Sequence, residues 1–271
     1  MLTITTTYKK EINLMNQLPL ILLVDDEEEI LDFLERILQP KYAVLKTSNG
    51  QEALQALASN VVQLIISDVM MPDMDGFALC SLIKSNVEYS HIPIILLTAK
   101  NTIQAKVQGL ELGADAYIEK PFSKEHLLAQ MASLLTNRNM IREYFANSPL
   151  VHINSMAHTK ADEQFLATLH AIIIEHMEEV ELDVEQLARY MNMSRVTLYR
   201  KITAISDHTP LELIHITRLK KAAELLVSGD YKMYEIAAMT GFSSQSNFTR
   251  NFHKQFGVAP TDYALRKNKD A

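Results

Sequence analysis

Short apolar runs and helical repeats of apolar residues alternate along the first half of the chain. The runs at 20–24 and 94–97 are continuous rather than alternating, which is typical of strands buried on both faces of a sheet. Between the runs, apolar residues recur every three or four positions, as in amphipathic helices. This order predicts an α/β doubly wound fold with a five-stranded parallel sheet. The predicted strands are 20–24, 42–45, 61–67, 93–97 and 116–118, and the predicted helices 30–38, 51–58, 77–83, 104–111 and 123–134.

The second half of the chain has helical periodicity throughout. Two short helices are predicted before two tight turns, and Asn192 in the first turn occupies the position of Gly241 in the second, an offset of 49 residues. Ser194 and Ser243 or Ser244 are suitable N-caps for the helices that follow. The pattern predicts an all-α domain with two helix-turn-helix units. The predicted helices are 161–178, 184–190, 195–203, 210–227, 233–239 and 245–256, the last ended by Gly257 and Pro260.

The two halves differ in charge. Residues 19–137 contain 16 acidic and 8 basic residues, a net charge of −8, whereas 186–271 contain 7 acidic and 13 basic residues, a net charge of +6. A basic domain favours a nucleic-acid partner. We expect a tail or remnant linker over 1–18, one domain over 19–137, a linker over 138–160 and the helical domain over 161–271.

Cysteine content and hydropathy bound the cellular setting. Cys80 is the single cysteine, so an internal disulfide is excluded. No apolar run of the sequence reaches the ~18 residues that a membrane span needs. These features favour a cytoplasmic protein with no membrane-inserted segment.

Chemically active side chains follow the ends of the predicted strands. Asp25 and Asp26 follow the first strand, Asp68 the third, Thr98 the fourth and Lys120 the fifth. In an open parallel sheet, ligands bind beyond the carboxyl ends of the strands, so these groups are expected to share one edge. Clustered carboxylates favour a divalent cation, and Mg²⁺ binds through carboxylate and phosphate oxygens. A carboxylate beside that ion can accept a phosphoryl group, with Lys120 pairing with its oxygens.

The segments LVDDEEEI, IISDVMMPDMDG, ILLTAK and AYIEKPF resemble, in order, those of the flavodoxin-like receiver domain of two-component response regulators. The resemblance implies that Asp68 is the phosphoacceptor and that Asp25, Asp26 and the Met70 carbonyl bind the metal. It also implies that Thr98 and Tyr117 form a switch pair and that Lys120-Pro121 is a cis peptide. Taken singly, each residue has a plainer interpretation, such as a helix cap or, for Tyr117, a core aromatic; their joint occurrence favours the functional one.

The second helix of each helix-turn-helix unit has the composition of a DNA-reading surface. Arginine pairs with guanine, asparagine and glutamine pair with adenine, and valine contacts thymine methyl groups. Leu198, Ile202, Phe248 and Phe252 are expected on the buried sides. The predicted DNA-binding residues are Arg195, Val196, Tyr199, Arg200, Gln245, Ser246, Asn247, Thr249 and Arg250, with Lys201, Lys220, Lys221, Lys254 and Lys267 as candidate phosphate contacts or simply solvated charges.

The segments VEQLARYMNMSRVTLYRKI, RLKKAAELL and YEIAAMTGFSSQSNFTRNFHKQFGVAPTDY resemble the AraC/XylS-type DNA-binding domain, except that Asn192 replaces the usual turn glycine. Together the two resemblances imply a phosphorylation-controlled transcription regulator, similar to the C-terminal part of hybrid two-component sensors. They imply a sensor histidine kinase, or the kinase part of a longer protein, as phosphate donor. They also imply double-stranded promoter DNA as target and a homodimer on phosphorylation.

Two other interpretations remain open at this point. A phosphatase-type enzyme with an aspartyl nucleophile would leave the two helix-turn-helix units unexplained, so we expect no enzyme beyond the receiver's own phosphotransfer and slow dephosphorylation. The alternative is a constitutive DNA-binding regulator whose receiver serves only for dimerisation.

Overall fold

The computed structural model describes residues 18–39, 41–99, 107 and 109–270, and these form two compact units divided between Leu135 and Thr136. The first unit is a five-stranded parallel sheet with the strand order β2-β1-β3-β4-β5. This is the flavodoxin-like order and confirms the predicted fold class. The strands are β1 (Leu20–Val24), β2 (Ala43–Thr47), β3 (Leu64–Asp68), β4 (Ile94–Thr98) and β5 (Ala116–Glu119).

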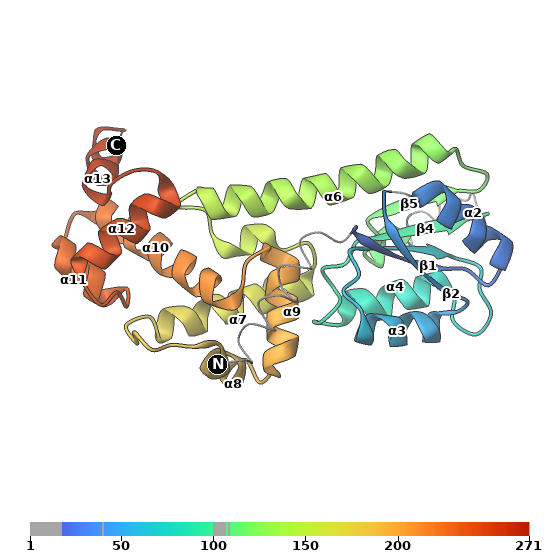
Figure 1. Cartoon of the computed structure of the whole chain (residues 1–271), viewed down its shortest axis with the longest axis horizontal. Coiled ribbons are helices and arrows are strands. Elements are labelled where there is room, and N and C mark those ends of the chain that lie inside the picture. The colour runs from blue at the N-terminus through green and yellow to red at the C-terminus, as the bar shows by residue number, and fades with distance from the viewer. Residues whose placement is uncertain (1–17, 40, 100–106, 108, 271) are drawn as a thin grey trace, which may run out of the picture. The chain divides into compact units, whose positions relative to one another are not determined.

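Helices cover both faces of this sheet (Figure 1). Alternate residues of β1 point to opposite faces: Leu22 and Val24 pack in one apolar cluster, and Ile21 and Leu23 in the other. Continuous apolar strands are therefore needed, because each face must bury its own row of side chains. One cluster includes α3 (Gly50–Ser59) and α4 (Gly76–Ser85), and the other includes α2 (Glu28–Leu38) and the start of α6 (Lys124–Asn147).

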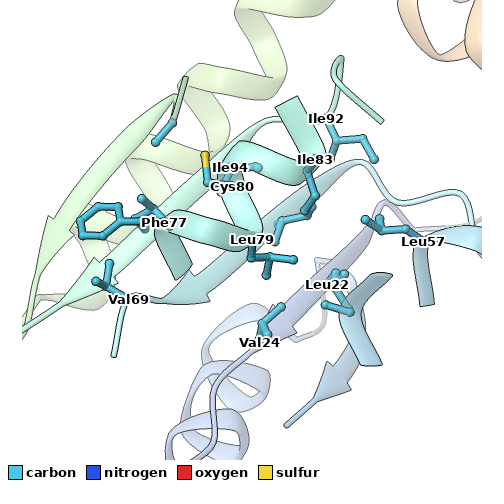
Figure 2. Packing of buried hydrophobic residues seen from close by; sticks show 14 of the residues in the cluster. Leu22, Val24, Leu57, Val69, Phe77, Leu79, Cys80, Ile83, Ile92 and Ile94 are labelled. Atoms are coloured by element: carbon cyan, nitrogen blue, oxygen red, sulfur yellow. The ribbon is translucent and has the colours of Figure 1, made fainter. Parts of the chain in front are cut away.

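Figure 2 shows how α4 packs on the sheet. Phe77, Cys80 and Ile83 are at most 7% exposed. Burial raises the pKa of the Cys80 thiol to about 11, so this cysteine is a packing residue rather than a reactive one. The predicted helix over 104–111 lies partly outside the described residues.

The second unit is helical and contains two successive pairs of short helices. The pairs are α8 (Val184–Tyr190) with α9 (Arg195–Ser206), and α11 (Met233–Met239) with α12 (Gln245–Phe256), and α10 (Pro210–Ser228) lies between them in sequence. Asp183 and Thr209 begin α8 and α10 with capping boxes, which satisfy free N–H groups at the helix starts. The remaining elements are η1 (Ile153–Met156), α7 (Lys160–Glu175) and α13 (Pro260–Asp270).

Two apolar clusters form the interior of the helical unit. One joins α7, α8, α9 and the first half of α10, and the other joins the second half of α10 with α11, α12 and α13. Residues that the sequence suggested as linker belong to the first cluster: α6 continues to Asn147, and Phe145, Ile153 and Met156 are at most 2% exposed. Among the described residues, none of the helices combines the length and hydropathy that crossing a membrane requires.

Candidate functional site

Three carboxylates meet at the carboxyl edge of the sheet. β1 and β3 are neighbours, so Asp25 and Asp26 after β1 come close to Asp68 at the end of β3. One oxygen from each of the three lies within 4.8 Å of the others. Asp25 and Asp68 are buried and Asp26 is exposed, which leaves the cluster open to solvent on one side.

Lys120 neutralises part of this negative charge. Its Nζ lies 2.9 Å from Asp68 Oδ1 and 3.1 Å from Asp25 Oδ2. Main-chain N–H groups complete the site: Glu27 donates to Asp25 Oδ1 at 3.0 Å, and Met70 donates to Asp68 Oδ2 at 3.2 Å. These contacts fix the orientation of both carboxylates before any ligand arrives.

The site perturbs the pKa values of its own groups. Burial raises the pKa of Asp25 above its ordinary value, although the Glu27 N–H group and Lys120 oppose the shift. Burial alone would lower the pKa of Lys120, but the carboxylates of Asp68 and Asp25 outweigh it and raise that pKa. Lys120 therefore stays charged at neutral pH.

This donor set fits a hard divalent cation. Three carboxylates within 4.8 Å offer oxygen ligands, and the exposed side at Asp26 leaves space for water molecules. Mg²⁺ keeps several waters and binds through one or two carboxylates. The residues present are thus suited to the magnesium ion predicted from the sequence.

The remaining predicted receiver residues lie on β4, on β5 and in the loop after β3. Thr98 ends β4 and is fully buried, and its carbonyl accepts the Lys120 N–H at 2.7 Å. Tyr117 is half-buried and packs against the apolar cluster of α3 and α4. Met70 is 54% exposed beside Asp68. The Lys120-Pro121 peptide is cis, as predicted.

Gly76, the last residue of the IISDVMMPDMDG segment, is a further requirement of this site to which the sequence assigned no role. A Cβ atom at Gly76 would lie 2.2 Å from the Asp68 carbonyl oxygen, far inside van der Waals contact. The Gly76 N–H donates to the Val69 carbonyl at 3.0 Å. The first residue of α4 must therefore be glycine for the loop after Asp68 to close.

The second helix of each pair in the helical unit is built alike. Ser194 Oγ accepts the Thr197 N–H at 3.0 Å, and Ser244 Oγ accepts the Asn247 N–H at 3.1 Å. The predicted tight turns before them pass through left-handed backbone at Asn192 (φ 52°) and Gly241 (φ 72°). The expected inward residues are buried at both helices: Leu198, Ile202, Phe248 and Phe252 are at most 1% exposed.

The predicted DNA-binding residues of these helices are exposed or half-buried. On α9, Arg195 and Val196 are exposed, and Arg195 Nη1 lies 3.1 Å from Glu185 Oε1. Tyr199 and Arg200 are half-buried. On α12, Gln245, Ser246 and Arg250 are exposed, and Asn247 and Thr249 are half-buried.

An open groove of about 460 Å³ runs along α12, and it includes a residue that the sequence analysis missed. The groove is lined by Gln245, Ser246, Thr249, Arg250, His253 and Ala259. His253 follows Ser246 and Arg250 at helical spacing, so it lies on the same face. That spacing was the available signal for adding His253 to the surface.

Two predicted phosphate contacts are wrong. Lys201 is 1% exposed, and its Nζ lies 2.5 Å from Asp162 Oδ1. Lys220 is 8% exposed, and its Nζ donates to the carbonyls of Phe145, at 2.6 Å, and Ser148. Both face the interior because a polar acceptor lies there. Lys221 is half-exposed and contacts Glu224, Lys254 is exposed, and the side chain of Lys267 lies outside the described residues.

Comparison with known proteins gives consistent matches to both units. The family model of the response regulator receiver domain matches residues 21–132, and that of a helix-turn-helix domain matches residues 187–266. Histidine kinase P4 of Formosa agariphila is 36% identical over 246 residues; the match covers 91% of this chain, and the chain spans 18% of that protein's length.

Two further relatives match different lengths of the chain. The probable transcriptional regulator ycf27 of Cyanidium caldarium is 35% identical over 215 residues, covering 75% of this chain and 85% of the relative. The receiver domain of a signal transduction histidine kinase from Syntrophus aciditrophicus is a solved structure with 38% identity. The match covers 44% of this chain and 91% of the chain in that structure, with a TM-score of 0.42.

Proposed function

The chain belongs to the response regulators that join a receiver domain to an AraC-type helix-turn-helix domain, a class of two-component, DNA-binding transcription regulators. We propose that phosphate on Asp68 controls its binding to promoter DNA. One observation carries the proposal. Carboxylates from two neighbouring strands and the ammonium of Lys120 converge at one sheet edge, with Lys120 Nζ 2.9 Å from Asp68 Oδ1.

The reaction is transfer of one phosphoryl group to Asp68. An oxygen of its carboxylate forms a bond to phosphorus while the bond from phosphorus to the donor nitrogen of a kinase histidine breaks. The electron pair of that bond leaves with the histidine, and the product is an acyl phosphate. Lys120 stays within ion-pair distance and balances charge on the phosphoryl oxygens.

A magnesium ion would be held by Asp25, Asp26, Asp68 and the Met70 carbonyl, and it would supply positive charge beside the phosphoryl oxygens. Thr98 and Tyr117 are the proposed switch pair, with the Thr98 hydroxyl donating to a phosphoryl oxygen. Their movement would change the receiver surface and favour pairing with a second copy. The donor is a sensor histidine kinase or the kinase part of a longer protein.

The DNA contacts come from α9 and α12, entering successive major grooves. Arg195, Val196, Tyr199 and Arg200 would read one groove, and Gln245, Ser246, Asn247, Thr249 and Arg250 the other. Side chains of this type form hydrogen bonds and apolar contacts with base edges. His253, which lines the α12 groove, is added to this surface.

Phosphorylation of the full chain with acetyl phosphate and Mg²⁺ tests the site. The matched control is Asp73→Asn, because Asp73 is an exposed aspartate five residues from Asp68. We expect intact-protein mass spectrometry to find one added phosphoryl group on the wild type and on Asp73→Asn, and none on Asp68→Asn. Labelling of Asp68→Asn equal to wild type would refute the assignment.

DNA affinity with and without beryllium fluoride, a mimic of the phosphoryl group, tests control of DNA binding. We expect tighter binding with the mimic for the wild type and no response for Asp68→Asn. If the wild type and Asp68→Asn bind DNA with equal affinity, both with and without the mimic, the result would instead support the constitutive regulator whose receiver serves only for dimerisation.

A further inference from the structure

Side chains from other helices hold the C-terminal carbonyls of α6 and α9. Arg142 of α6 donates from Nε to the Ile205 carbonyl at 3.0 Å and from Nη2 to the Ala204 carbonyl, at the end of α9. In turn, Gln255 of α12 donates from Nε2 to the Ala146 carbonyl at 3.1 Å, at the end of α6. The last turns of α6 thus contact both helices that we propose to read DNA.

Lys220 of α10 reinforces the same helix end. Its Nζ donates to the Phe145 and Ser148 carbonyls and lies 4.3 Å from the centre of the Phe145 ring. The Phe145 side chain is fully buried. Three different helices of the unit, α9, α10 and α12, therefore share polar contacts with the segment 142–148.

These contacts supply hydrogen-bond donors that the C-terminal carbonyls of a helix need. The last four carbonyls of an α-helix have no partner within the helix, and burying them without a donor is unfavourable. Cationic donors at a helix C-terminus also interact favourably with the helix dipole. Because the acceptors belong to one helix and the donors to another, satisfying them fixes the helices relative to each other.

We propose that the segment 142–148 is a clamp that holds α9 and α12 in the arrangement needed to engage two major grooves at once, with Arg142 and Gln255 as its positioning residues. The inference rests on the proposed DNA binding by both helices. The clamp precedes the region 187–266 matched by the helix-turn-helix model. Neither residue lies in the groove along α12.

The expected consequence follows from preorganisation. When one helix occupies its groove, the second binds as an intramolecular event whose strength depends on how well it is already placed. A fixed arrangement avoids the entropy cost of ordering the second helix on the DNA. Loosening the clamp should weaken two-groove binding, spare one-groove binding and relax the preferred spacing between the two sites.

The probe is a duplex selected from a random-sequence library by the full wild-type chain. Two derivatives are made from it, one with one groove's sequence scrambled and one with two base pairs inserted between the grooves. The variants are Gln255→Leu, which removes the amide donor at similar size, and Arg142→Met, which removes the guanidinium. Gln164→Leu is the matched control, because Gln164 is exposed on α7.

For Gln255→Leu and Arg142→Met we expect about tenfold weaker binding to the selected duplex and less than twofold change on the one-groove duplex. Discrimination against the inserted spacing should fall at least threefold by the same reasoning. Arg142→Lys should restore part of the loss, because an ammonium can still donate to one carbonyl. Gln164→Leu should match the wild type throughout.

Two results overturn the clamp while leaving the DNA-binding proposal intact. Equal losses on the one-groove and two-groove duplexes would mean that the residues only support folding, and unchanged affinity with unchanged spacing preference would mean that they position nothing. If Arg142→Met fails to fold, Gln255→Leu still decides, since it alters one half-buried side chain near the end of α12. A wild-type chain that selects no duplex would overturn the DNA-binding proposal itself, and the clamp with it.

Discussion

Replacing Lys201 by methionine removes the cation that the buried carboxylate of Asp162 contacts. Their side chains are at most 1% exposed, with Nζ 2.5 Å from Oδ1, and Nζ lies 5.7 Å from the centre of the Phe165 ring. Breaking such a buried pair costs ~3–5 kcal/mol, mainly because the remaining charge stays desolvated. We expect Lys201→Met to lower the free energy of unfolding of the helical unit by that amount.

Urea unfolding of the full chain, followed by circular dichroism, measures the loss. With a slope of about 2 kcal/mol per molar urea, the midpoint of the helical unit should fall by roughly 1.5–2.5 M. The double variant Lys201→Met with Asp162→Leu should recover to within about 1 kcal/mol of wild type, because apolar residues can replace a buried ion pair.

DNA binding supplies the second measurement on Lys201→Met. A lysine that contacts a DNA phosphate contributes about 1 to the slope of log affinity against log salt. Because Lys201 is buried, we expect the Lys201→Met variant, measured without urea where it is folded, to have the same salt slope of DNA affinity as the wild type. A slope reduced by about 1, together with a stability within about 0.5 kcal/mol of wild type, would refute the structural assignment of Lys201.

Two further predictions concern the helical unit. Burial lowers the pKa of Lys220 to about 8. Between pH 8 and about 10.4, the unfolded chain therefore keeps a proton on Lys220 that the folded chain has lost. Over that pH range the free energy of unfolding should rise by about 3 kcal/mol relative to the Lys220→Met variant. Parallel urea titrations at several pH values measure this, and identical pH profiles for the two proteins would contradict it. Gly241→Ala should cost more than about 2 kcal/mol, against about 1 kcal/mol for Gly229→Ala. Both glycines have positive φ. A Cβ atom at Gly241 would lie 2.2 Å from the Met177 carbonyl oxygen, whereas no atom lies within 4 Å of a Cβ atom at Gly229. Equal melting temperatures of the two variants would contradict this difference in close approach.

The fold was predictable where sequence pattern alone determines structure. Strands buried on both faces need unbroken apolar runs, so β1 and β4 were placed to within a residue or two. Helix starts were placed equally well: the helix predicted over 184–190 begins at Val184, and the predicted cap Ser194 precedes α9. Pro260 was read as ending a helix, yet it begins α13, because proline fits the first turn of a helix as well as the residues after one.

Burial of charged residues was not predictable, because it depends on partners far along the chain. Asp162 and Lys201 are 39 positions apart, and Lys220 and Phe145 are 75 apart. A lysine in a helix-turn-helix sequence is usually solvated, so nothing local distinguishes Lys201 from Lys254. The receiver carboxylates were predictable from the sequence, because ligands of an open parallel sheet bind beyond the carboxyl ends of its strands and these aspartates follow such ends.

The net charge of the second half therefore overstates the charge available to DNA. Residues 186–271 contain 13 basic residues, but Lys201, Arg218, Lys220 and Lys221 already contact acceptors within the protein. Each DNA phosphate neutralised contributes about 0.9 to the salt slope, so the slope should reflect exposed bases such as Arg250 and Lys254 rather than composition. Under the clamp proposal, Lys220 and Lys201 affect DNA affinity only indirectly, because Lys220 binds the end of α6 and Lys201 anchors α9 to Asp162. A salt slope that fell when Lys220 alone was replaced, at constant spacing preference, would show instead that this lysine reaches a phosphate.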